Sequence, residues 1–153
     1  ISPSNIVLFG DSAGGHLAIT LVLALRDAGK LPRPKAMVLV SPWTDLREHF
    51  LENDPRLQYD VLVGGVPVRE WLVGAAGAAL EARVTEPLLS PALANLTGLP
   101  PMLIMSGELE AMGSQIEEFV RVVKEHAVAV QHHVGPEMFH NYVMFKNTGA
   151  VPQ

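Results

Sequence analysis

The sequence NIVLFGDSAG, residues 5–14, joins a short apolar run to a serine flanked by glycines. A continuous apolar run of this length that ends at glycine predicts a strand buried on both faces, as strands of parallel sheets are. Leucines then recur at helical spacing over residues 13–28, and Gly29 supplies a stop signal. The stretch therefore predicts a strand, a tight turn and a helix in direct succession.

The same alternation of elements continues along the chain. Residues 35–40 and 101–106 are two more apolar runs, and each predicts a buried strand. Residues 114–125 carry apolar side chains on one helical face and charged ones on the other, which predicts a helix packed on the sheet. Residues 127–134 predict a fourth strand. Strands that alternate with helices indicate an α/β fold with a mostly parallel sheet, flanked by helices and joined by right-handed crossovers.

Residues 47–99 lack this regularity. Prolines at positions 55, 67, 87 and 91 interrupt the segment, and only residues 70–83 carry a pattern compatible with a helix. We interpret residues 47–99 as an inserted, cap-like excursion from the sheet.

Composition excludes several classes of function. The chain has 153 residues, 48% of them hydrophobic, which suits one globular domain. A net charge of -5 without any basic run argues against a nucleic-acid partner or a polybasic membrane surface. The longest apolar run, residues 17–25, is about half of the roughly 20 residues that a membrane span requires. With no cysteine, the chain has no disulfide framework, cysteine-ligated metal site or thiol nucleophile.

The motif around Ser12 carries the clearest chemical information. Gly10 and Gly14, two residues before and after the serine, permit the strained strand-to-helix turn that lifts a nucleophilic hydroxyl above a sheet. The N–H of Ala13 lies at the start of the predicted helix, where the helix dipole favours the negative charge of an oxyanion. Ser12 is therefore a candidate nucleophile and Ala13 a candidate oxyanion-hole donor. The alternative is a glycine-rich turn whose serine takes no part in catalysis.

A serine nucleophile needs a base, which histidine supplies because its pKa lies near neutrality. His140 is the preferred candidate among six histidines, because it follows the last predicted strand at the sheet edge where Ser12 lies. His16 stands one helical turn beyond Ser12, and we expect it to pack against a neighbouring loop. The other histidines are expected in the fourth strand, at a helix end or in the excursion: His132, His133, His126 and His49.

The base in turn needs a carboxylate to orient it, in the chain order serine, acid, histidine. Glu110 and Glu108 both lie in the loop after the third predicted strand, and Glu110 is preferred because it lies deeper in that loop. Asp45, in the loop after the second strand, is a further candidate. These acids can also be solvated loop residues or, for the two glutamates, part of an acidic first turn of the following helix. No H-E-x-x-H metal pattern and no phosphate-binding loop occurs in the sequence.

Taken together, the motifs resemble the hormone-sensitive-lipase-like esterases, a branch of the α/β hydrolases, over most of the chain. The resemblance implies a triad of Ser12, Glu110 and His140, and hydrolysis of small-molecule carboxylic esters with short or medium acyl chains through an acyl-enzyme. It implies no metal and no organic cofactor. The motifs that carry it are GDSAGGHLA (10–18), SPWTDL (41–46), LSP (89–91), LPPM (99–102), GELE (107–110) and MFH (138–140).

Two departures from this family pattern matter. Family members usually carry aspartate where Glu110 stands, which leaves room for Glu108 to be the partner of the base. The family's H-G-G-G segment, which supplies further oxyanion donors, lies upstream of the turn that carries the serine, and nothing before Ile1 can hold it. We therefore expect residues 1–153 to be the C-terminal part of the catalytic domain without its N-terminal half. Such a chain is expected to expose a strand edge and an apolar sheet face, to fold poorly and to hydrolyse esters weakly or not at all.

Two other functions use the same framework. One is a non-catalytic small-molecule receptor like the plant gibberellin receptors, which resemble these esterases but lose the catalytic histidine. The presence of His140 favours an enzyme over such a receptor. The other is a peptidase or acyltransferase relative with the same triad.

Overall fold

The computed structural model describes residues 2–29, 33–47, 53–67 and 78–145. Its strands and long helices, in chain order, are β1 (Val7–Asp11), α1 (Ala13–Ala28), β2 (Ala36–Val40), β3 (Met102–Gly107), α5 (Gly113–Glu125) and β4 (Val130–Gly135). Short helical turns are η1 (Pro3–Asn5), η2 (Pro55–Gln58), α4 (Ala78–Glu81), η3 (Pro91–Leu93) and η4 (Tyr142–Phe145). The four predicted strands and the two predicted long helices are thereby confirmed.

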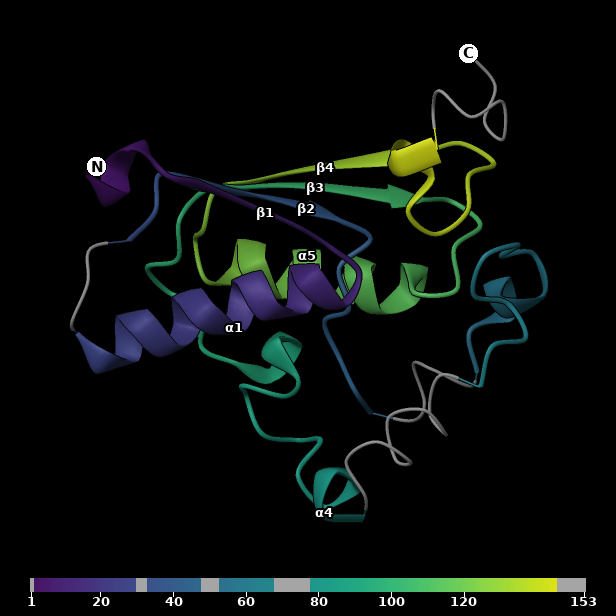
Figure 1. Cartoon of the computed structure of the whole chain (residues 1–153), viewed down its shortest axis with the longest axis horizontal. Helices are drawn as coiled ribbons and strands as arrows, with labels where there is room; N and C mark the ends of the chain where they lie inside the picture. The colour runs from purple at the N-terminus through teal and green to yellow at the C-terminus, as the bar shows by residue number, and fades with distance from the viewer. Residues whose placement is uncertain (1, 30–32, 48–52, 68–77, 146–153) are drawn as a thin grey trace.

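The four strands form one parallel sheet in the order β1-β2-β3-β4. All carboxyl ends therefore lie at one edge of the sheet, where the loops after β1, β3 and β4 gather (Figure 1). The predicted start of the fourth strand is wrong by three residues. His126 caps α5 and Ala127 adopts a positive φ of 54°, so that these residues form the turn that precedes β4.

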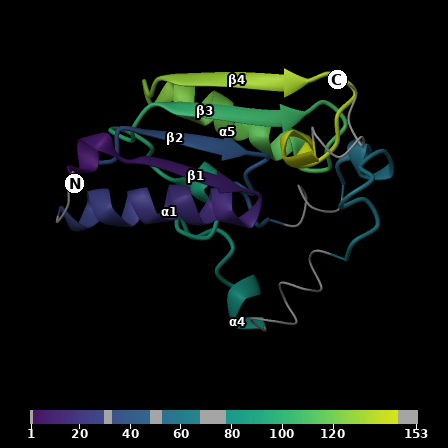
Figure 2. The ribbon, with the colours of Figure 1, turned by 45° about the horizontal axis from the view of Figure 1, so that its top comes forward.

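Both long helices lie on the same face of the sheet (Figures 1 and 2). Between them and the sheet lies the core, which includes Ile19, Met37, Ile104 and Phe119. None of the helices among the described residues is both long and apolar enough to cross a lipid bilayer.

β1 is one of the two edge strands of the described sheet, and its outer face shows the exposure that was expected of an apolar sheet face. Leu8 packs against the core, whereas Val7 and Phe9 are exposed. Side chains alternate across a strand, so Val7 and Phe9 lie on the face opposite the two long helices. In the described part of the chain, that face of β1 remains open to solvent.

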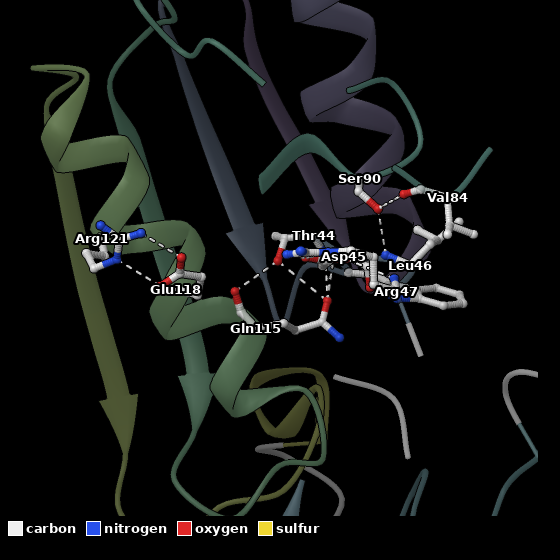
Figure 3. A network of polar contacts seen from close by, with 10 residues as sticks. Thr44, Asp45, Leu46, Arg47, Val84, Ser90, Gln115, Glu118 and Arg121 are labelled. Carbon is white, nitrogen blue, oxygen red and sulfur yellow. Dashed lines mark hydrogen bonds and ion pairs between the residues drawn. The ribbon is translucent and has the colours of Figure 1, made fainter. Parts of the chain in front are cut away.

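The loop that follows β2 is held by a polar network (Figure 3). The side chain of Gln115 on α5 accepts hydrogen bonds from the N–H groups of Thr44 (2.8 Å) and Asp45 (3.0 Å). Ser90 Oγ accepts a third from Leu46 N–H at 2.9 Å. These bonds attach the loop after β2 to α5 and to Ser90. Of the helix expected over residues 70–83, the structure shows α4, and residues 68–77 lie outside the described residues.

Candidate active site

Ser12 occupies a sharp turn between β1 and α1. Its φ of 50° and ψ of -119° lie in a region that residues with a side chain rarely adopt, and such strain clusters at functional sites. Backbone hydrogen bonds to the neighbouring strand and to the loop after it hold this conformation in place. Ser12 N–H donates to the carbonyl of Val40 (2.9 Å), and the Ser12 carbonyl accepts from Trp43 N–H (3.0 Å). The end of β2 and the loop after it therefore fix the position of the serine backbone.

The glycines around Ser12 differ in how strictly they are required. A Cβ on Gly10 would overlap the carbonyl of Gly14, lying 2.6 Å from its carbon, and a Cβ on Gly15 would lie 2.7 Å from Pro42 Cβ. A Cβ on Gly14 would meet nothing closer than Asp11 Oδ1 at 3.9 Å. Close packing therefore demands glycine at positions 10 and 15, and the expectation that position 14 shares this role is wrong on steric grounds.

Ala13 is the first residue of α1 and is exposed. The N–H groups of the first helical turn have no acceptor within the helix, and the helix dipole makes this end partially positive. The Ala13 N–H is thus available to a negatively charged oxygen beside Ser12.

Glu110 and His140 face one another in the interior. His140 is 2% exposed and Glu110 is fully buried. Glu110 Oε1 lies 3.6 Å from His140 Nδ1, and neither atom has a hydrogen-bond partner among the described residues. The other carboxylate oxygen, Oε2, accepts from Ser41 Oγ (2.7 Å) and from Gly107 N–H (2.5 Å). These two bonds fix the carboxylate so that its free oxygen points at the imidazole.

The other two candidate acids have different partners. Glu108 is exposed and its Oε2 accepts from Glu137 N–H at 2.9 Å. Asp45 is buried, and its carboxylate pairs with Arg47, whose Nη2 lies 2.6 Å from Oδ2. The structure therefore brings Glu110, and neither Glu108 nor Asp45, beside His140.

The loop that carries His140 is attached to the turn that carries Ser12. Asn141 Nδ2 donates to Asp11 Oδ2 at 3.0 Å, and Asn141 N–H donates to Ser41 Oγ at 2.9 Å. Ser41 thus touches both this loop and Glu110. Among the described residues Ser12 Oγ makes no hydrogen bond with His140, and the link between the loop and the turn runs through the residues adjoining them, Asn141 and Asp11.

Ser41 and Asn141 were not among the candidate site residues taken from the sequence. Ser41 adopts a φ of 43° and Asn141 a φ of 58°, so each sits at a sharp turn of the backbone. In the sequence, Ser41 directly follows the second predicted strand and Asn141 directly follows His140, and these positions were the available signals of a role in the site. Those signals do not reveal which backbone or side-chain group each residue meets.

The remaining histidines have partners away from Ser12 or are exposed. His16 Nε2 lies 3.1 Å from the carbonyl of Leu89, as expected for a residue that packs against a loop, and burial lowers its pKa. His49 lies outside the described residues. The others are His126, within 2.9 Å of the Val122 carbonyl, His132, within 2.8 Å of Ser106 Oγ, and His133, which is exposed.

Known proteins share both the sequence pattern and this architecture. The model of a family described as alpha/beta hydrolase fold matches residues 1–144. An acetyl-hydrolase of Streptomyces hygroscopicus is 36% identical over 138 residues, which cover 90% of this chain and 45% of that protein.

Two solved structures share this arrangement. The structure of EstE5 soaked with p-nitrophenyl butyrate has a TM-score of 0.82 and 29% identity, covering 99% of this chain and 49% of that one. A hormone-sensitive lipase from a metagenome library has a TM-score of 0.78 and 32% identity, covering 96% and 50%. The chain spans about half the length of each of these three relatives.

Proposed function

The chain belongs to the alpha/beta hydrolase fold family, and on this premise we propose that it supplies the catalytic residues of a serine carboxylesterase. The resemblance to hormone-sensitive-lipase-like esterases is confirmed by the relatives it matches. The observation that carries the proposal is the buried approach of Glu110 to His140, in a loop bonded to the turn of Ser12. The proposed substrates are small-molecule carboxylic esters.

In the proposed reaction, His140 accepts the Ser12 hydroxyl proton while Ser12 Oγ attacks the ester carbonyl. The negative charge that develops on the carbonyl oxygen is stabilised by the Ala13 N–H and the start of α1. His140 then gives the proton to the departing alcohol, leaving an acyl group on Ser12. Water, deprotonated by His140, attacks this acyl group, and collapse of the resulting intermediate returns the proton from His140 to Ser12 Oγ and releases the carboxylic acid. Glu110 orients the imidazole and stabilises its cationic form in both halves of the cycle.

Short or medium acyl chains are the proposed specificity. Two of the relatives support it: one is called an acetyl-hydrolase, and another was soaked with the four-carbon ester p-nitrophenyl butyrate. Residues 47–99 are proposed to form a cap-like segment beside the site. Asp60 of this segment accepts hydrogen bonds from the loop that carries Glu110 (the acid loop) and from the loop that carries His140 (the base loop).

A fluorophosphonate probe tests the nucleophile directly. We expect the protein encoded by the gene to lose ester turnover as the probe reacts, and mass spectrometry to place one adduct on the peptide containing Ser12. Labelling of a different serine, or full turnover after complete labelling of Ser12, would contradict the assignment. A protein that binds ester ligands but neither reacts with the probe nor turns esters over would instead be a receptor on the same fold.

Replacing Glu110 with glutamine is expected to lower kcat by about 10²- to 10⁴-fold, because a neutral amide can neither hold the correct imidazole tautomer nor stabilise the imidazolium. The matched control is Glu108→Gln, two residues earlier in the same loop, where the carboxylate is exposed. This control should stay within about threefold of the wild type, as exposed groups away from the chemistry do. Steady-state kinetics on p-nitrophenyl butyrate decide between them. An equal or larger loss in Glu108→Gln would show that Glu108 is the acid.

A further inference from the structure

Asp60 is a buried acid within the stretch 53–67, most of whose side chains are exposed or half-buried. Its side chain is 3% exposed, whereas its neighbours Tyr59 and Val61 are 55% and 80% exposed. A carboxylate is costly to remove from water, so its burial here requires strong compensating hydrogen bonds. Because Asp60 is buried between two exposed neighbours, the hydrogen bonds of its side chain help to hold this stretch in place.

The compensating partners are four backbone N–H groups. Oδ1 accepts from Leu62 (3.0 Å) and Val63 (3.2 Å), in the segment of Asp60 itself. Oδ2 accepts from Ala111 (2.7 Å) and His140 (3.3 Å), which lie 51 and 80 residues further along the chain. One carboxylate thereby joins three separate stretches of backbone.

Two of these N–H groups belong to the acid and base loops. Ala111 directly follows Glu110, and the N–H of His140 is that of the base itself. A shift of either loop would change the 3.6 Å separation of Glu110 Oε1 from His140 Nδ1. We infer that Asp60 is a positioning residue that sets the acid and the base of the triad relative to one another. The inference rests on the proposed esterase function.

An asparagine at position 60 tests this role with almost no change of shape. It replaces one carboxylate oxygen by an NH2 group, which is a donor. One of the two pairs of N–H groups then faces a donor instead of an acceptor. Because misplacement of a catalytic group by about 1 Å can cost 10²-fold in rate, the loss should appear in kcat.

Asp54 is a matched control in the same segment. Its carboxylate is also buried, and it accepts from Arg56 N–H (2.9 Å) and from Ser114 N–H (3.1 Å) at the start of α5. Asp54 therefore anchors the segment to the fold through the same kind of bond. Unlike Asp60, it bonds to no backbone group in the loops of Glu110 and His140.

The experiment compares Asp60→Asn with Asp54→Asn in the protein encoded by the gene. For Asp60→Asn we expect kcat on p-nitrophenyl butyrate to fall by about 10- to 100-fold with KM within about threefold. Hydrogen exchange measured by NMR should quicken at least about tenfold at the amides of Ala111 and His140. For Asp54→Asn we expect kcat within about threefold, and faster exchange at Arg56 and Ser114 instead.

Several outcomes overturn the inference. The first is a folded Asp60→Asn protein with kcat within about threefold of the wild type. The second is an equal loss of kcat in both variants, which would reduce Asp60 to a structural anchor. If Asp60→Asn does not fold, Asp60→Glu tests the role instead, because it keeps the charge but displaces the carboxylate oxygens. A loss of at least about threefold in kcat supports positioning, and a wild-type kcat overturns it. If the wild type itself does not hydrolyse esters, the proposed function fails, and unchanged exchange at Ala111 and His140 in Asp60→Asn would then refute the role of Asp60 separately.

Discussion

Replacing Ser12 with alanine is expected to lower kcat for p-nitrophenyl butyrate by at least about 10³-fold, because removal of the nucleophile of a triad leaves only binding and oxyanion stabilisation. The loss should appear without unfolding. Ser12 Oγ forms no hydrogen bond among the described residues, so its removal leaves no partner unsatisfied, and alanine meets the same φ of 50° as serine does. Steady-state kinetics and a thermal melt of the same preparation measure the two effects.

A second serine provides the control. Ser4 is exposed and its hydroxyl bonds only to Ser2 among the described residues, so Ser4→Ala should keep kcat within about twofold. A Ser12→Ala protein that retains more than about a tenth of wild-type kcat would refute the proposed nucleophile. Equal losses in both variants would point to a general effect on folding.

Gly10→Ala is expected to destabilise the protein by about 3 kcal/mol or more, which is the upper range for overpacking. The added Cβ would lie 2.6 Å from Gly14 C and 2.8 Å from Gly15 N. These are backbone atoms of the first turn of α1, and they cannot rotate away as a side chain can. We expect the melting temperature to fall by roughly 6–12 °C for a chain of this size, with loss of soluble expression as the extreme form of the same effect.

Gly14→Ala is the matched control, four residues further along the same turn. Its Cβ would have no neighbour closer than 3.9 Å, and alanine favours a helix over glycine by about 0.5–1 kcal/mol. The variant should therefore be as stable as the wild type or slightly more stable. Urea unfolding followed by circular dichroism measures the free energy of unfolding of both variants. Similar destabilisation of the two variants would mean that the tight packing lies elsewhere in the turn.

Local pattern sufficed for the elements, and it named Ser12, Glu110 and His140 as candidates for the site. The apolar run before Gly10, the leucine spacing after it and the later strand and helix patterns each reflect a period that one element imposes on its own residues. Glu110 was separable from Glu108 because it lies deeper in its loop, and burial beside His140 agrees with that choice. The apolar run of β1 predicts a strand that can be covered on both faces, and the exposure of Val7 and Phe9 agrees with the expectation that this chain leaves an apolar sheet face open.

Long-range hydrogen bonds were beyond prediction for a different reason. Asp60 lies in a segment without periodicity, and nothing local distinguishes it from a solvated acid. Its partners at Ala111 and His140 become neighbours only when β3 and β4 stand side by side. The same holds for Ser41 and Asn141, which meet across 100 residues of sequence. Such contacts follow from tertiary geometry, and a one-dimensional pattern does not contain them.

The strand order β1-β2-β3-β4 also matches the order in which a ribosome releases the chain. Each strand that emerges finds the free edge of the one before it, so the sheet can grow in a single direction during translation. The turn of Ser12 is synthesised before the loop of His140, by on the order of ten seconds at ordinary elongation rates. On the proposed assignment, the nascent chain carries the nucleophile without its base throughout that interval. Ester hydrolysis by Ser12 would therefore be absent until the loop after β4 has been added.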